Sequence, residues 1–136
     1  MRTNAEILKR IREVDSEDLM GFEVSYLREF LPYKLLPKKA QEKIDPTAWL
    51  EPCRSAECIR ERMVDYMPFA WEKANDGRGI SAYRSLCHYK TWLWMIGEDW
   101  GDITVGYTDY GKPTLRRLCA FLGLDSARLE AGERYL

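Results

Sequence analysis

GISAYRSLCHYKTWLWMIG, residues 79–97, is the stretch that decides the fold of this chain. Its apolar residues recur every three or four positions, as one face of a helix requires. The first apolar stripe consists of Ala82, Leu86, Tyr89, Leu93 and Ile96. A second stripe runs beside it, and Trp92 and Met95 make the last turn apolar nearly all round. Such a helix is normally buried among other helices. We therefore predict a buried central helix, with Ser81 as its N-cap and Gly97 as its left-handed C-terminal residue.

Length and composition predict one all-α domain that covers residues 1–136. A chain of 136 residues falls within the usual size of a single domain. Its hydrophobic content of 46% supports a real core and excludes intrinsic disorder. With 21 basic and 22 acidic residues the net charge is −1, so a whole-protein field that holds DNA is not expected, although a local basic patch stays open. The expected architecture is a compact helical bundle around the central helix.

The sequence predicts a cytoplasmic protein. No run of eighteen apolar residues occurs, so no transmembrane span is expected. The N-terminal residues 1–15 are interrupted by charges and lack the apolar stretch of a signal peptide. In the cytosol cysteines stay reduced, and the spacing of these four does not fit a metal site. We expect them to be small buried hydrophobic residues: Cys53, Cys58, Cys87 and Cys119.

Helical spacing also predicts the elements on either side of the central helix. Helical pieces are expected over residues 4–14, 16–21, 22–31, 38–44 and 54–75, then from Lys112 and from Asp125. Pro68 cannot donate to the carbonyl of Val64, so we expect a kink or a break in the 54–75 helix. The short connector after this helix predicts an antiparallel hairpin with the central helix. The glycine-containing stretch 98–111 predicts an ordered loop.

The loop that follows the central helix is the first candidate functional surface. It contains four acidic residues between positions 98 and 109 and no Lys or Arg, with aromatic residues interleaved. Acidic groups at a helix C-terminus are unfavourable, so we expect compensation by an arginine from elsewhere or by a basic partner. One interpretation is a contact surface for a basic protein; the other is a solvated loop whose aromatics pack on the bundle. The predicted contact residues are Asp99, Trp100, Asp102, Tyr107, Asp109 and Tyr110.

Basic residues make a second candidate surface. Three of them lie in one stretch, Lys34, Lys38 and Lys39, and Arg78 and Arg84 flank the start of the central helix. A helix N-terminus with two arginines predicts an anion site. Together the five cations give the second hypothesis, a nucleic-acid contact. The alternatives are a solvated helix face for the lysines and structural ion pairs for the arginines.

The sequence predicts no catalytic site, cofactor or metal. His88 is the only histidine, and no serine, cysteine or acid is placed by spacing to act with it. Cys87 adjoins it, but neighbours on a helix point about 100° apart. The acidic residues Glu98, Asp99 and Asp102 have no spacing that would force them onto one Mg²⁺ ion. We expect a structural histidine and a protein that is not an enzyme.

Three segments carry a resemblance: GRGISAYRS (77–85), WLWMIGED (92–99) and YGKPTLRRLCAFLG (110–123). They resemble a group of small uncharacterised proteins encoded in phages, prophages and other bacterial mobile elements. The shared pattern is an R-G-I-S-x-x-R-S helix start, a W-L-W helix end and a Y-G-x-P helix opening, and it covers about residues 71–123. The loop after Gly97 departs from it. The resemblance implies an accessory protein of the bacterial cytoplasm and assigns no catalytic residues.

These observations lead to one functional hypothesis. We expect a phage- or mobile-element-type accessory protein that acts by binding another protein. The expected partner is a host or defence component, and the mobile-element context extends the hypothesis to inhibition of the anti-CRISPR kind. A nucleic-acid partner is the second choice, and no membrane partner is expected.

Overall fold

Every regular element in the part of the chain that the structure describes is a helix. The computed structural model describes residues 1–16, 30–36, 38–43, 45–48, 52–75, 79–101, 103 and 111–133. The α-helices are α1 (Asn4–Ser16), α3 (Lys38–Lys43), α4 (Ala56–Asn75), α5 (Gly79–Met95), α6 (Lys112–Leu122) and α7 (Ser126–Glu130). Two short 3₁₀ turns join them, η1 (Tyr33–Leu35) and η2 (Pro46–Ala48). The predicted all-α fold is confirmed.

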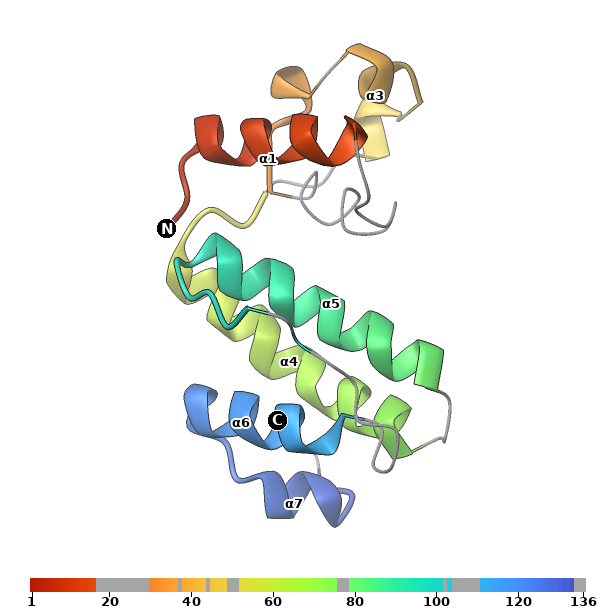
Figure 1. Cartoon of the computed structure of the whole chain (residues 1–136), viewed down its shortest axis with the longest axis vertical. Helices are drawn as coiled ribbons and strands as arrows, with labels where there is room; N and C mark the ends of the chain where they lie inside the picture. The colour runs from red at the N-terminus through yellow and green to blue at the C-terminus, as the bar shows by residue number, and fades with distance from the viewer. Residues whose placement is uncertain are drawn as a thin grey trace.

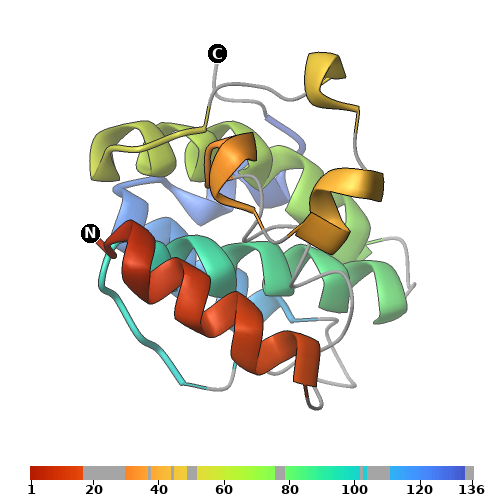
Figure 2. The same cartoon turned by 90° about the horizontal axis from the view of Figure 1, so that it is seen from above.

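The α4–α5 hairpin forms the middle of the molecule. Helices α4 and α5 lie side by side and antiparallel, as the sequence predicts, and α6 and α7 pack against α4 (Figure 1). Helix α1 and the short elements η1 and α3 lie on the other side, over α5 (Figure 2). Phe30 and Leu31 are fully buried and tie that side to the common core. The predicted pieces over residues 17–29 lie outside the described residues.

Helix α5 is the buried centre that its sequence predicts. Its buried residues come from all sides of the helix: Ala82, Ser85, Leu86, Cys87, Tyr89, Thr91, Trp92, Leu93 and Met95. The hydroxyl of fully buried Tyr89 donates a hydrogen bond of 3.0 Å to the Met63 carbonyl on α4, so this buried phenol is satisfied. Gly97 ends the helix with φ of 87°, and the Glu98 N–H donates to the Leu93 carbonyl over 2.8 Å.

The N-terminal residues hold α1 against the end of α5. Thr3 and Glu6 form a reciprocal capping box, in which the Glu6 N–H donates to the Thr3 hydroxyl and the Thr3 N–H donates to the Glu6 carboxylate. The Arg2 guanidinium donates to the Trp94 carbonyl over 3.1 Å, and the Arg2 N–H donates to the Met95 carbonyl over 2.7 Å. A cation therefore covers the negative end of α5. The compensation that the sequence requires at this helix end comes from within the chain.

Helices α6 and α7 begin and end where the sequence places them. Leu115, Leu118 and Cys119 are buried along α6. Gly123 ends the helix with φ of 73°, and the Leu124 N–H donates to the Cys119 carbonyl. The Asp125 carboxylate accepts from the Ala127 N–H and caps α7, which buries Leu129.

Pro68 does not divide α4 into two helices. The helix runs unbroken from Ala56 to Asn75, so the predicted break does not occur. Residues on both sides of the proline, including Met67 and Trp71, are buried in the common core. Their burial keeps both halves of α4 helical within the same core, because packing of this size outweighs one missing backbone hydrogen bond.

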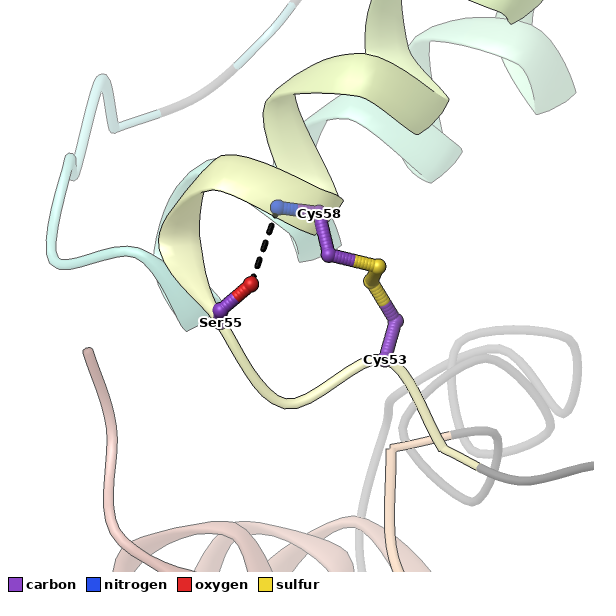
Figure 3. Close-up of a disulfide and its surroundings, with 3 residues drawn as sticks. All are labelled: Cys53, Ser55 and Cys58. Carbon is purple, nitrogen blue, oxygen red and sulfur yellow. Dashed lines mark hydrogen bonds between the residues drawn. A yellow bond between two sulfur atoms is a disulfide. The ribbon is translucent and has the colours of Figure 1, made fainter.

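The cysteine prediction is wrong for one pair. Cys53 and Cys58 form a disulfide, with Cα atoms 6.0 Å apart (Figure 3). The Ser55 hydroxyl accepts from the Cys58 N–H and starts α4, so the preceding chain folds back and Cys53 meets the first turn of the helix. Two cysteines only five positions apart meet here because of this local turn. Cys87 and Cys119 are free and buried, as expected.

The central position of α5 predicts a large difference between two leucine substitutions. Leu93→Ala removes a side chain that is 1% exposed, whereas Leu35→Ala trims one that is 36% exposed on η1. We expect Leu93→Ala to lower the free energy of unfolding by about 3 kcal/mol through lost burial and a residual cavity. Leu35→Ala should change it by less than about 1 kcal/mol. Urea unfolding of both variants tests this; equal losses would contradict a core built on α5.

The disulfide predicts a defined thiol count and a stability change. The native protein should present no rapidly reacting thiol, and the unfolded, unreduced protein should present two, Cys87 and Cys119. Cys53→Ser with Cys58→Ser should lower the free energy of unfolding by about 2 kcal/mol, because the unfolded chain loses a short covalent loop. A thiol assay and urea unfolding measure both. Four titratable thiols in the unreduced unfolded protein would show that the bond does not form.

Candidate interaction surfaces

Asp99 occupies part of the surface predicted for the loop after α5. It is exposed, and its carboxylate accepts a hydrogen bond of 2.9 Å from the Gly101 N–H. This bond fixes the turn that leaves α5. Asp102, Tyr107, Asp109 and Tyr110, the other predicted contact residues apart from Trp100, lie outside the described residues. The loop therefore contributes one oriented carboxylate to the described surface.

Trp100 is packed onto the bundle instead of standing free. Its ring meets the Phe121 ring edge-on at 5.6 Å between centroids, and the Arg117 guanidinium lies 4.0 Å from its centroid. Phe121 in turn carries the Arg60 guanidinium at 4.7 Å. This alternating set of cations and rings joins the loop to α6 and α4. Trp100 thus follows the alternative that the sequence left open, an aromatic residue that packs back on the helices.

The predicted basic surface is divided between different parts of the fold. Lys34, Lys38 and Lys39 are exposed on η1 and α3, which lie beside α1 (Figures 1 and 2). Arg84 is exposed on α5, and Arg78 lies outside the described residues. No described cleft contains any of these lysines or Arg84. The nucleic-acid contact stays a prediction.

The most spacious of the described clefts is a groove between α4 and α6. It has a volume of about 520 Å³ and is lined by Glu57, Arg60, Glu61, Val64, Asp65 and Leu122. Val64 and Leu122 are half-buried, whereas the charged residues are exposed. The groove therefore has an apolar floor and a charged rim, which is the usual composition of a surface that receives an amphipathic segment.

The rim of this groove is predominantly acidic. Glu57, Glu61 and Asp65 follow each other at four-residue intervals, so α4 presents them on one face. None of the three has an ion pair or a hydrogen bond within the described ranges. Like charges at this spacing destabilise a helix by a few tenths of a kcal/mol per pair. The single cation of the groove, Arg60, lies over the Phe121 ring.

Sequence reasoning missed this groove although its signal was present. The acidic repeat 57, 61, 65 is visible in the sequence, but one charged helix face does not show which helix packs beside it. Leu122 comes from α6, more than fifty residues further along the chain. Only the packing of α6 on α4 converts a solvated face into the wall of a groove.

His88 is a structural residue in an aromatic cluster. It stacks on Tyr66 at 4.9 Å between ring centroids and meets Trp92 edge-on at 5.6 Å. Burial disfavours the charged imidazolium and lowers the pKa of His88 from 6.5 to about 4. A neutral histidine with so low a pKa is a weak base at pH 7, which agrees with a structural role.

Metal and membrane features are not seen in the described residues. No group of three or more His, Cys, Asp or Glu side chains gathers there in a way that holds a metal ion. None of the helices found there combines the length and the apolar character that crossing a membrane requires.

Comparison with known proteins returns no match. The chain matches no protein family, no curated protein and no solved structure.

The buried position of His88 predicts a pH dependence of stability. Its folded pKa of about 4 lies below the ordinary 6.5, so the unfolded state binds more protons between these values. The resulting contribution to the free energy of unfolding is present above pH 6.5 and is lost as the pH falls towards 4. We expect His88→Gln to show a smaller loss of stability than the native protein between pH 7 and pH 4.5. Urea unfolding of both proteins at both pH values measures this loss. An equal loss in the native protein and in His88→Gln would mean that His88 is exposed to water in the folded state.

Proposed function

We propose that this protein acts by binding another protein, and that the α4–α6 groove receives a basic amphipathic segment of the partner. The observation that supports the proposal best is the combination of an apolar floor with three unpaired carboxylates on one helix face. Unpaired acidic repeats cost helix stability in the free protein. A partner that brings lysines or arginines removes this cost on binding.

The chemistry of the groove selects a particular kind of partner. Val64 and Leu122 offer apolar contacts, and Glu57, Glu61 and Asp65 offer ion pairs along about two turns of α4. Pro68 has no N–H for the Val64 carbonyl, so a groove residue also carries a backbone acceptor without its usual helical donor. A helix with leucines on one face and lysines beside them matches these features.

The partner class follows the resemblance in the sequence. We propose a phage- or mobile-element-type accessory protein that works in the bacterial cytoplasm without catalysing a reaction. Its target is a host or defence component, and occupation of a basic surface on that target would inhibit it in the manner of an anti-CRISPR protein. The neutral, aromatic-packed His88 supports the view that no general base operates here.

Charge neutralisation in the groove tests the proposal. The probe is a synthetic amphipathic helix of about 14 residues with lysines on one face and leucines on the other. Glu61→Gln with Asp65→Asn should weaken its binding about three- to tenfold, because two exposed ion pairs are lost. Leu122→Ser, which keeps every charge, should also weaken it. Fluorescence anisotropy of a labelled peptide measures the affinities.

A matched pair of substitutions controls for net charge. Glu42→Gln on α3 with Glu72→Gln at the far end of α4 removes the same two charges from outside the groove. This variant should bind the peptide with nearly native affinity. If both double variants lose the same amount of peptide affinity, or if Leu122→Ser does not change the affinity, the peptide binds by non-specific charge attraction. Either result overturns the proposal.

A further inference from the structure

A separate cleft lies between α1, α5 and the loop that follows α5. It has a volume of about 240 Å³, and its walls come from Arg10 on α1, from α5 and from the loop. The lining residues are Arg10, Lys90, Leu93, Trp94, Asp99, Trp100, Gly101 and Ile103. It shares no residue with the α4–α6 groove. Two indole rings and two cations thus meet in one small space.

The two cations of this cleft have no anionic partner among the described residues. The Arg10 guanidinium lies over the Trp94 ring, 4.6 Å from the ring centroid, and a guanidinium in such a position can still donate its N–H groups to an anion. Neither Arg10 nor Lys90 has a hydrogen bond or an ion pair in the described part of the chain. Both side chains are half-buried. Arg2 also lies near Trp94, but its charge is paired with Glu6 at 3.1 Å.

Asp99 is the carboxylate of the described lining, and it already accepts a hydrogen bond. Asp99 accepts from the Gly101 N–H, and no ion pair joins it to Arg10 or Lys90. Within the described lining, two positive charges face one negative charge, which favours an anion. Trp94, Trp100, Leu93 and Ile103 supply flat and apolar walls, which favour a ring.

The size of the cleft limits the ligand further. Sites for drug-sized ligands measure about 300–1,000 Å³, so a cleft of about 240 Å³ is too small for a nucleotide and fits a single ring with one charged group. We propose that this cleft binds a small one-ring aromatic anion, with Arg10 and Lys90 on the carboxylate or phosphate and the indoles of Trp94 and Trp100 against the ring.

The test uses the full chain and three probes: phenyl phosphate, benzoate and inorganic phosphate. Each is titrated to about 10 mM, which saturates a site with a Kd of about 1 mM. Indole N–H signals in ¹H–¹⁵N spectra, assigned with Trp94→Phe and Trp100→Phe, report the binding. We expect both aromatic anions to shift the Trp94 and Trp100 signals and to bind more tightly than inorganic phosphate. No shift with either aromatic anion overturns the proposal, and so does equal affinity for inorganic phosphate.

Substitutions of opposite sign make the test sharper. Lys90→Met and Arg10→Gln should each weaken binding of the aromatic anions about tenfold, because each removes a charge-assisted contact. Asp99→Asn keeps the acceptor for the Gly101 N–H and removes the negative charge of the described lining, so it should strengthen binding severalfold. The controls are Lys73→Met, which removes a lysine stacked on Phe69 outside the cleft, and Arg12→Gln, on an exposed residue of α1. The proposal is overturned if Lys73→Met weakens binding as much as Lys90→Met, or if Arg12→Gln weakens it as much as Arg10→Gln. Weaker binding of the aromatic anions to the Asp99→Asn variant also overturns it.

Discussion

The requirement to cover α5 on all sides determines the rest of the structure. This helix buries residues around its whole circumference, so one neighbouring helix cannot shield it from water. Helix α4 covers one side, and α1 covers another (Figure 2). Phe30 and Leu31 belong to the same buried core. The N-terminus is fixed by the same requirement, because Arg2 binds the last carbonyls of α5. The arrangement of the bundle around the hairpin follows from one helix that buries residues on every side.

Most of the fold was readable from local sequence signals. Three local signals predict the bounds of α4 to α7 to within a few residues: the spacing of apolar residues, a glycine after the last turn and an acidic N-cap. Each signal acts over only one or two helical turns. The Thr3–Glu6 capping box is equally local, because its two residues lie three positions apart at the start of α1. Pro68 shows the limit of local rules: buried neighbours on both sides keep α4 continuous.

The candidate sites were less readable, because they depend on pairs of distant segments. One set of stacked side chains joins α4, α6 and the loop: Arg60, Phe121, Trp100 and Arg117. The spacing of these residues in the sequence does not predict their contact. The groove rim was visible as an acidic repeat, but its floor needs Leu122 from another helix. The disulfide was mispredicted for a different reason. A reducing cytosol predicts free thiols, whereas Cys53 and Cys58 lie only five positions apart across the start of α4 and can meet.

Helix α4 has two different faces, and the difference explains where binding falls. One face buries Ile59, Met63 and Met67 and must keep its residues for the core. The other carries the acidic repeat and is partly covered by α6, which leaves Val64 half-exposed beside carboxylates. A rigid, core-anchored helix loses little conformational entropy when a partner binds, so its exposed face is a better platform than a loop. In the loop after α5, by contrast, Trp100 packs against Phe121, and Asp99 accepts a hydrogen bond within its own turn. The acidic groove is therefore an unsatisfied surface on a helix that the core anchors.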